Sequence, residues 1–231
     1  MIVKPFIQTV LLGILCSAFQ LVSAQPAFET RAPKETEKVK AALSVLNELS
    51  QMKERIPERL LAISQGIIIV PKMVNGGFVI GGKHGKGLAL VKNEQGQWSD
   101  PVFVTLTGGS FGLQAGVQAV DLILVFKNNK TLLEMSKGSF TLGGDLSVAA
   151  GPVGRSSSAS TDYKLEAEVY SYSRSKGFFA GLTLNGVALS VDQKANREFY
   201  EEFDPAGHLF STFNNSSGEV QDLKAALIKL E

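Results

Sequence analysis

The hydrophobic residues of the chain follow two periods, which separate helical ends from a β-rich centre. In residues 34–52 the apolar side chains recur at steps of three and four, so they form one stripe of a helix. This stripe consists of Val39, Ala42, Leu43, Leu46, Leu49 and Met52. A shorter helix follows, with Pro57 in its first turn and Gly66 at its end. A C-terminal amphipathic helix carries Val220, Leu223, Leu227 and Leu230 on one side.

From residue 66 onward, branched and aromatic residues come in runs cut by Gly, Pro and Asn, which is typical of short strands joined by turns. An aromatic residue is repeatedly followed by a glycine. These pairs are Phe78 and Gly81, Phe111 and Gly116, Phe140 and Gly143, and Phe178 and Gly181. Glycine inside a strand marks a bulge, a bend or a close backbone approach. We therefore predict an α+β fold, with a glycine-rich, strongly curved antiparallel sheet or partly closed barrel flanked by N-terminal and C-terminal helices.

Three further segments have local signals of their own. Residues 163–169 alternate apolar and charged side chains, which predicts a half-buried strand. Residues 131–135 are expected to form one helical turn between strands. Residues 193–203 are expected to form a helix that closes the β-rich body.

The N-terminal segment, residues 1–24, has the features of a secretory signal peptide: one early lysine, an apolar run and small residues before a cleavage point after Ala24. We therefore expect an exported protein, located in the periplasm or cell envelope. The only cysteine, Cys16, lies inside the apolar run and would be removed with it. Disulfide and thiolate chemistry are then excluded from the mature chain.

The remaining chain is long enough to bury a sizeable core and is expected to form one domain over residues 34–231. Residues 25–33 are a polar connector before it. The body of the domain covers about residues 56–203, and residues 204–231 form a helical extension.

Overall charge excludes binding to nucleic acid by bulk electrostatics. The chain has 23 Lys and Arg against 22 Asp and Glu, and removal of Lys4 with the signal peptide balances them. A local patch is different, because no acidic residue occurs between Glu58 and Glu94. The basic residues in that stretch are Arg59, Lys72, Lys83, His84, Lys86 and Lys92. A cation-only patch on glycine-rich β-structure predicts an anion site.

Two glycine-rich motifs admit both a functional and a plain interpretation. Residues 81–87, GGKHGKG, match neither a P-loop nor a dinucleotide fingerprint, and a solvent-exposed hairpin turn is the simpler interpretation. Residues 151–158, GPVGRSSS, offer backbone N–H groups, hydroxyls and the Arg155 guanidinium, which could hold a phosphate. A mobile loop explains them equally well.

Signals for catalysis and metal binding are weak. Residues 108–112, GGSFG, fit the nucleophile pattern of a serine hydrolase at Ser110, with His208 downstream. That motif requires a strand, a sharp turn and a helix, whereas this stretch predicts more strand. His84 and His208, the only histidines, lack a second ligand at metal spacing. We expect no enzyme activity, no cofactor and no metal.

Taken together, several segments resemble the SYLF domain family, from residue 56 to about 200. The resemblance rests on the spaced glycines, Gln114, Asp121, the GPVGR run at 151–155 and the YSRSKG run at 172–177.

This resemblance implies a lipid-binding module. Eukaryotic relatives bind phosphoinositides and membranes, and some bind or bundle actin, whereas bacterial relatives are often secreted single-domain proteins, the branch this chain matches. It implies an anionic phospholipid membrane as partner, with headgroup binding assigned to Lys72, Lys83, Lys86, Arg155, Arg174 and Lys176. The alternatives are an envelope scaffold that binds a protein polymer, as relatives bind actin, and a serine hydrolase at Ser110.

Overall fold

The computed structural model describes residues 33–52, 55–152, 166–175, 178–180, 182–200, 203, 209–210 and 217–231. The expected signal peptide lies outside this part of the chain. The α+β class is confirmed, with helices at both ends and strands between them. The helices in the described ranges are α1 Pro33–Ser50, α2 Glu58–Ile63, α3 Lys130–Leu133, α4 Gln193–Phe199 and α5 Gly218–Leu230, with a 3-10 helix η1 at Glu134–Lys137.

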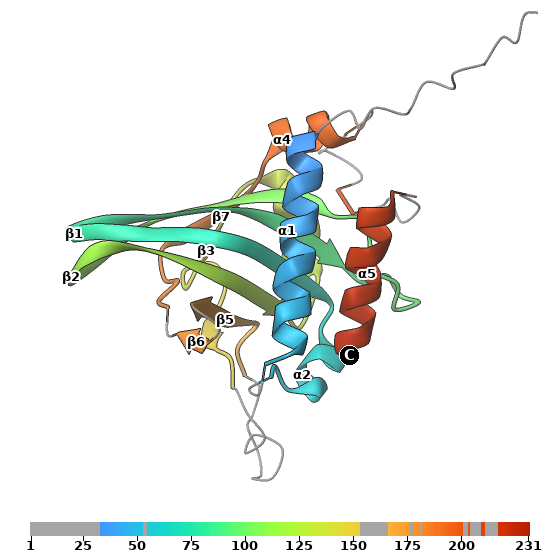
Figure 1. The fold of residues 1–231 in the computed structure, drawn as a ribbon, viewed down its shortest axis with the longest axis horizontal. Helices are drawn as coiled ribbons and strands as arrows, with labels where there is room; N and C mark the ends of the chain where they lie inside the picture. Colours follow the sequence, from blue (N-terminus) through green and yellow to red (C-terminus); the bar gives the residue numbers. More distant parts are fainter. Residues whose placement is uncertain are drawn as a thin grey trace, which may run out of the picture. The chain divides into compact units, whose positions relative to one another are not determined.

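The strands join in one sheet built around two long antiparallel strands, β1 Gly66–Val91 and β2 Val102–Phe126 (Figure 1). One half of β2 pairs with β7 Val187–Val191, and the other half pairs with β5 Val169–Ser175. Three short strands complete the described sheet: β3 Phe140–Leu142 beside β7, and β4 Val148–Ala150 and β6 Phe178–Ala180 beside β5.

The sheet curves until its two edges nearly meet. β3 and β4 stand at opposite ends of the strand order, yet only residues 143–147 separate them in the chain. A bridge between Leu142 and Leu146, and a hydrogen bond from the Gly143 N–H to the Leu146 carbonyl (2.7 Å), hold this connection. The prediction of a strongly curved sheet or partly closed barrel is confirmed. One pairing is not antiparallel, because β4 runs parallel to β5.

β1 also folds back on itself, so that its two halves lie between the two halves of β2. The Lys92 N–H donates to the Gln65 carbonyl (2.9 Å) just beyond the two ends of β1. A methyl group placed on Gly87 would lie 2.3 Å from the backbone oxygen of Ile69, so the two halves of β1 lie side by side. The expected hairpin turn at residues 81–87 is therefore wrong. These residues continue the strand, and glycine is needed there because another backbone approaches closely.

Apolar side chains fill both faces of the sheet. On one face, Leu46 of α1 and Leu223 of α5 pack with Ile69 of β1. On the other face, Val70 packs in a second cluster that includes Met135 of η1. Because successive strand residues point to opposite faces, a sheet covered on both sides has continuous apolar runs rather than alternation. Figure 1 shows α1 and α5 lying together across the sheet.

Two predicted boundaries differ from the structure. Of the strand expected at 163–169, residues 163–165 lie outside the described part of the chain, residues 166–168 are irregular, and β5 begins at Val169. Side-chain hydroxyls accept the hydrogen bonds of their backbone N–H groups instead. The Ala167 N–H donates to the Tyr170 hydroxyl (3.1 Å), and the Glu168 N–H donates to the Ser147 hydroxyl (3.0 Å). The helix expected at 193–203 ends at Phe199, because Tyr200 is extended.

Candidate functional site

A β-bulge in β1 displays Lys72 on the surface. The register between β1 and β2 shifts between Val70 and Met73, so Pro71 and Lys72 together stand opposite Asp121. Lys72 is exposed and takes a φ of 50°, in the left-handed region. A non-glycine residue keeps this conformation only where its surroundings hold it, and such residues cluster at functional sites. The bulge is therefore a candidate site.

Asp121 and Arg174 hold the bulge in place. Asp121 Oδ1 accepts a hydrogen bond from the Lys72 backbone N–H (3.0 Å), and Oδ2 accepts one from Arg174 Nη2 (2.5 Å). Arg174 is only 8% exposed and also forms an ion pair with Glu48 of α1 (2.7 Å). Burial alone would lower the pKa of Arg174, but its hydrogen bonds to Asp121 and Glu48 raise it. The guanidinium stays charged and links α1, β2 and β5.

Lys83 and Lys86 lie further along β1, on opposite faces. Lys83 is 6% exposed and its ammonium donates to the Thr183 carbonyl, with no acidic partner among the described residues. Burial lowers the pKa of Lys83. Lys86 is exposed and forms an ion pair with Asp192 (2.6 Å), the N-cap residue of α4.

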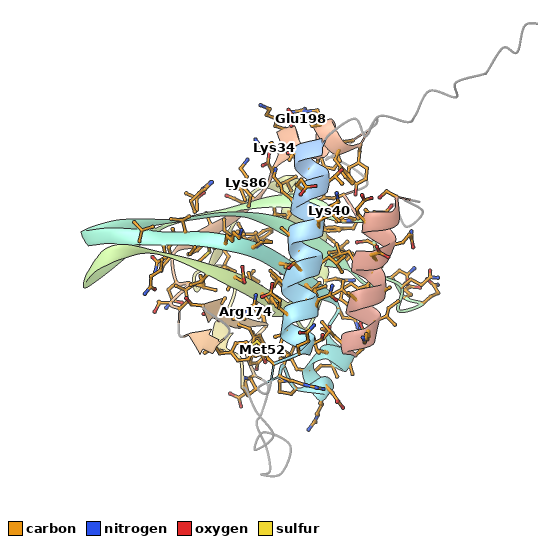
Figure 2. All side chains as sticks on the ribbon, in the orientation of Figure 1. Lys34, Lys40, Met52, Lys86, Arg174 and Glu198 are labelled. Carbon is orange, nitrogen blue, oxygen red and sulfur yellow. The ribbon has the colours of Figure 1, made fainter. Side chains whose placement is uncertain are left out.

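The structure brings together only part of the predicted headgroup site. Lys72 and Arg174 meet at Asp121. Figure 2 shows Lys86 and Arg174 near different ends of α1, well apart. Arg155 and Lys176 lie outside the described residues. Lipid binding by any of these residues stays a prediction.

Sequence reasoning missed the carboxylates of this site. In the sequence, Asp121 stands out only within the family resemblance, and Glu48 is not singled out. A usable signal existed for Asp121, because it is the first charged residue after an uncharged run over residues 101–120. Nothing local marks Glu48, whose role depends on how α1 docks.

Beyond the bulge, β1 and β2 extend past the other strands. We call residues 73–82 and 109–120 the ribbon tip. β7 pairs with β2 no further than Gly108, and β5 pairs with β2 only from Asp121 onward. Within the described pairings, the β2 part of the tip is thus bonded to β1 alone. In Figure 1 the tip extends away from the helices.

The structure also bears on the hydrolase alternative. Ser110 lies within the continuous strand β2, opposite Gly81, so the strand, turn and helix of a nucleophile elbow are not found at this serine. His208 lies outside the described part of the chain. Among the residues that the structure places, no group of three His, Cys, Asp or Glu side chains could hold a metal ion. None of the described helices is long and apolar enough to cross a membrane.

Fold and site together define an α+β domain with a nearly closed sheet, whose most distinctive surface is a strained lysine beside a protruding ribbon. Residues 107–230 match the Ysc84 family, described as Las17-binding protein actin regulator. The chain belongs to this family, which confirms the SYLF resemblance.

Curated relatives agree with this assignment. The chain is 31% identical to SH3 domain-containing YSC84-like protein 1 of Bos taurus, over 70% of this chain and 49% of the relative. It is 32% identical to LAS seventeen-binding protein 3 of Saccharomyces cerevisiae, over 72% of this chain and 37% of the relative. The chain therefore matches half or less of each relative's length. The name of the yeast relative states a binding function, and neither name describes an enzyme.

Proposed function

We propose that the domain binds anionic phospholipid headgroups at a membrane surface, without catalysis. The observation that carries this proposal is the exposed Lys72, fixed on a strained bulge by Asp121. Within the described structure its ammonium forms no ion pair. The stretch of sequence that contains Lys72, residues 59–93, has no acidic residue, and the carboxylate of Asp121 next to Lys72 is paired with Arg174. A lysine ammonium is a point charge that suits phosphate oxygens, and the bulge presents it to solvent.

Electrostatics sets the expected strength of this interaction. A lysine close to an anionic membrane contributes about 1 kcal/mol, and the attraction decays within a Debye length. Because the chain has nearly balanced charge overall and the other described cations of the predicted site are buried or paired, binding depends on Lys72. Binding should therefore be weak, selective for anionic lipid and sensitive to salt.

Co-sedimentation with vesicles tests the proposal. The full chain is mixed with phosphatidylcholine vesicles or with vesicles containing phosphatidylglycerol, at rising salt. Lys72→Asn should lower binding to the anionic vesicles about fivefold, the equivalent of one lysine. Asparagine tolerates the left-handed conformation, so the fold should be kept.

Lys194→Asn is the matched control, because its side chain is 84% exposed and lies on α4, outside the bulge. It should bind like wild type. Equal binding of the wild-type chain to neutral and anionic vesicles would contradict headgroup recognition, as would equal losses in the two variants.

A second candidate is a scaffold that binds a protein polymer in the cell envelope. The family description, Las17-binding protein actin regulator, supports it. A pull-down from envelope extract that recovers a stoichiometric protein partner, together with no vesicle binding, would favour this candidate.

A further inference from the structure

The ribbon tip lacks charge. Neither residues 73–82 of β1 nor residues 109–120 of β2 include Asp, Glu, Lys, Arg or His. Charged side chains return where the other strands join the sheet, with Lys72 and Asp121 on one side and Lys83 on the other. A protruding part of a protein that meets only water normally carries charged side chains. The tip is therefore suited to a less polar environment.

Exposed apolar side chains lie on this tip. Val117 is 76% exposed and Val74 is 44% exposed. The register pairs Val74 with Ala119 and Gly76 with Val117, so these residues share one face of the ribbon. Exposed valines on a protruding strand pair form an apolar surface that has no partner within the described structure.

Charge complementarity indicates what this surface meets. Lys72 lies directly before the tip in β1 and is exposed, whereas Asp121, directly after the tip in β2, is paired with Arg174, which also pairs with Glu48 of α1. An uncharged, apolar end bordered by an available cation matches a bilayer surface, where phosphates lie just outside the hydrocarbon. The backbone sets a limit on depth, because strand edges with free N–H and C=O groups do not enter the hydrocarbon core.

We propose that the ribbon tip inserts into the interfacial layer of an anionic membrane, with Val74 and Val117 at the boundary of the acyl chains and Lys72 at the level of the phosphates. This inference rests on the proposed lipid-binding function. It adds the surface that enters the membrane and the orientation of the domain, with the tip directed toward the lipid and α1 held on the sheet.

Site-specific fluorescence tests the insertion. Cys16 is the only cysteine, so Cys16→Ser with Val117→Cys gives one labelling site for an environment-sensitive NBD fluorophore. The control is Cys16→Ser with Ile228→Cys, an apolar residue of α5 that is 63% exposed. With phosphatidylglycerol vesicles, NBD emission should shift to the blue and brighten at position 117 and stay unchanged at position 228.

The outcomes separate the two proposals. If the protein sediments with anionic vesicles while the label at position 117 does not respond, the tip does not insert although lipid binding stands. If it does not sediment with any vesicle, both proposals fail. A response at both positions would also contradict a defined orientation of the domain.

A charge substitution gives an independent measurement without a label. Val117→Asp should lower vesicle affinity roughly tenfold, because it removes apolar contact and repels anionic lipid. Ile228→Asp should leave vesicle affinity unchanged. Both side chains are exposed, so both variants should melt like wild type. Equal vesicle binding by Val117→Asp and wild type would overturn the insertion.

Discussion

The buried side chain of Asn196 pairs with the backbone of Phe103 as a neighbouring strand would. The Phe103 N–H donates to Asn196 Oδ1 (2.9 Å), and Asn196 Nδ2 donates to the Phe103 carbonyl (2.9 Å). β7 begins to pair with β2 at Val104, and the Asp192 N–H just after β7 also donates to the Phe103 carbonyl (2.9 Å), so the Asn196 amide supplies the partner of the Phe103 N–H. It also attaches α4 to the sheet.

Asn196→Ala should therefore lower the free energy of unfolding by about 1–3 kcal/mol, because it leaves a buried backbone N–H without a partner. Urea unfolding measures the change. Asn47→Ala is the control, since Asn47 is exposed in α1, and it should be neutral or slightly stabilising. Equal losses of unfolding free energy in the two variants would show that the hydrogen bonds between Asn196 and Phe103 do not stabilise the fold.

A charge in the stripe of α1 should destabilise the whole domain. Leu46 is 1% exposed and packs against the sheet and α5, so Leu46→Asp should lower the melting temperature with or without vesicles. Leu46→Ala should cost about 2–5 kcal/mol. The exposed Asn47→Asp serves as control. If Leu46→Asp melted like wild type and lost only vesicle binding, α1 would be a membrane anchor instead.

The ion pair between Lys86 and Asp192 predicts a pH dependence. Burial alone would raise the pKa of Asp192, but hydrogen bonds from Lys86 and the Ala195 N–H, and the charges of Lys86 and Lys38, lower it below 3.8. A carboxyl with a lowered folded pKa stabilises the fold above its unfolded pKa, and this stabilisation is lost as pH falls through the folded value.

Lys86→Gln should therefore melt at a lower temperature than wild type near neutral pH, and the difference should shrink as the pH falls below 3.8. Melting curves at several pH values measure this convergence. Lys194→Gln, which removes an exposed partner of Glu198, is the control and should show little difference at any pH. If the difference in melting temperature between Lys86→Gln and wild type stayed constant down to strongly acidic pH, the lowered pKa of Asp192 could not be due to Lys86.

Trp98, the only tryptophan, provides a fluorescence signal that is sensitive to the C-terminal end of α5. Glu231 Oε1 accepts a hydrogen bond from Trp98 Nε1 (2.9 Å) and pairs with Lys92 Nζ (3.1 Å). Lys92 Nζ lies 5.0 Å from the centre of the indole ring. Glu231→Ala leaves the buried Lys92 without this acid, so Trp98 emission should shift to the red and thermal stability should fall. Glu219→Ala, at the start of α5, should leave the emission unchanged.

The close approach within β1 predicts a contrast between two glycines. Gly87→Ala should cost about 3 kcal/mol or more, because its methyl group would lie 2.3 Å from the Ile69 backbone oxygen, which cannot move freely. Gly109→Ala should be nearly neutral, since a Cβ there meets nothing within 4 Å. Chemical unfolding of both variants measures the contrast, and similar behaviour would contradict the doubling back of β1.

Periodicity predicted those parts of the fold that local sequence determines. The stripes of α1 and α5 and the turn at α3 follow from residues a few positions apart, and each is found in the structure. The curvature of the sheet was also predictable, because glycines recur inside apolar runs. The role of Gly87 was not, because it depends on Ile69, which the chain brings alongside only when β1 doubles back.

The candidate site was only partly predictable for a similar reason. Lys72 stood out as a cation in a stretch without acids, but its strained backbone depends on Asp121. Arg174 is predicted to bind the headgroup, whereas the structure pairs it with Glu48 and Asp121. Charge counted along a sequence cannot show which charges neutralise one another across strands.

Because β1 folds back between the two halves of β2, the order in which these strands pair determines when the apolar stripe of α1 can be buried. The pair Ala89–Val102 closes a short loop, whereas Gly66–Phe126 joins residues far apart in the chain, so loop-closure entropy favours zipping from the former. Sheets dominated by distant pairings fold slowly, in milliseconds to seconds. Because α1 packs on this sheet and on α5, its leucines stay exposed until both have formed. During synthesis that stripe is available to chaperones or to misassembly.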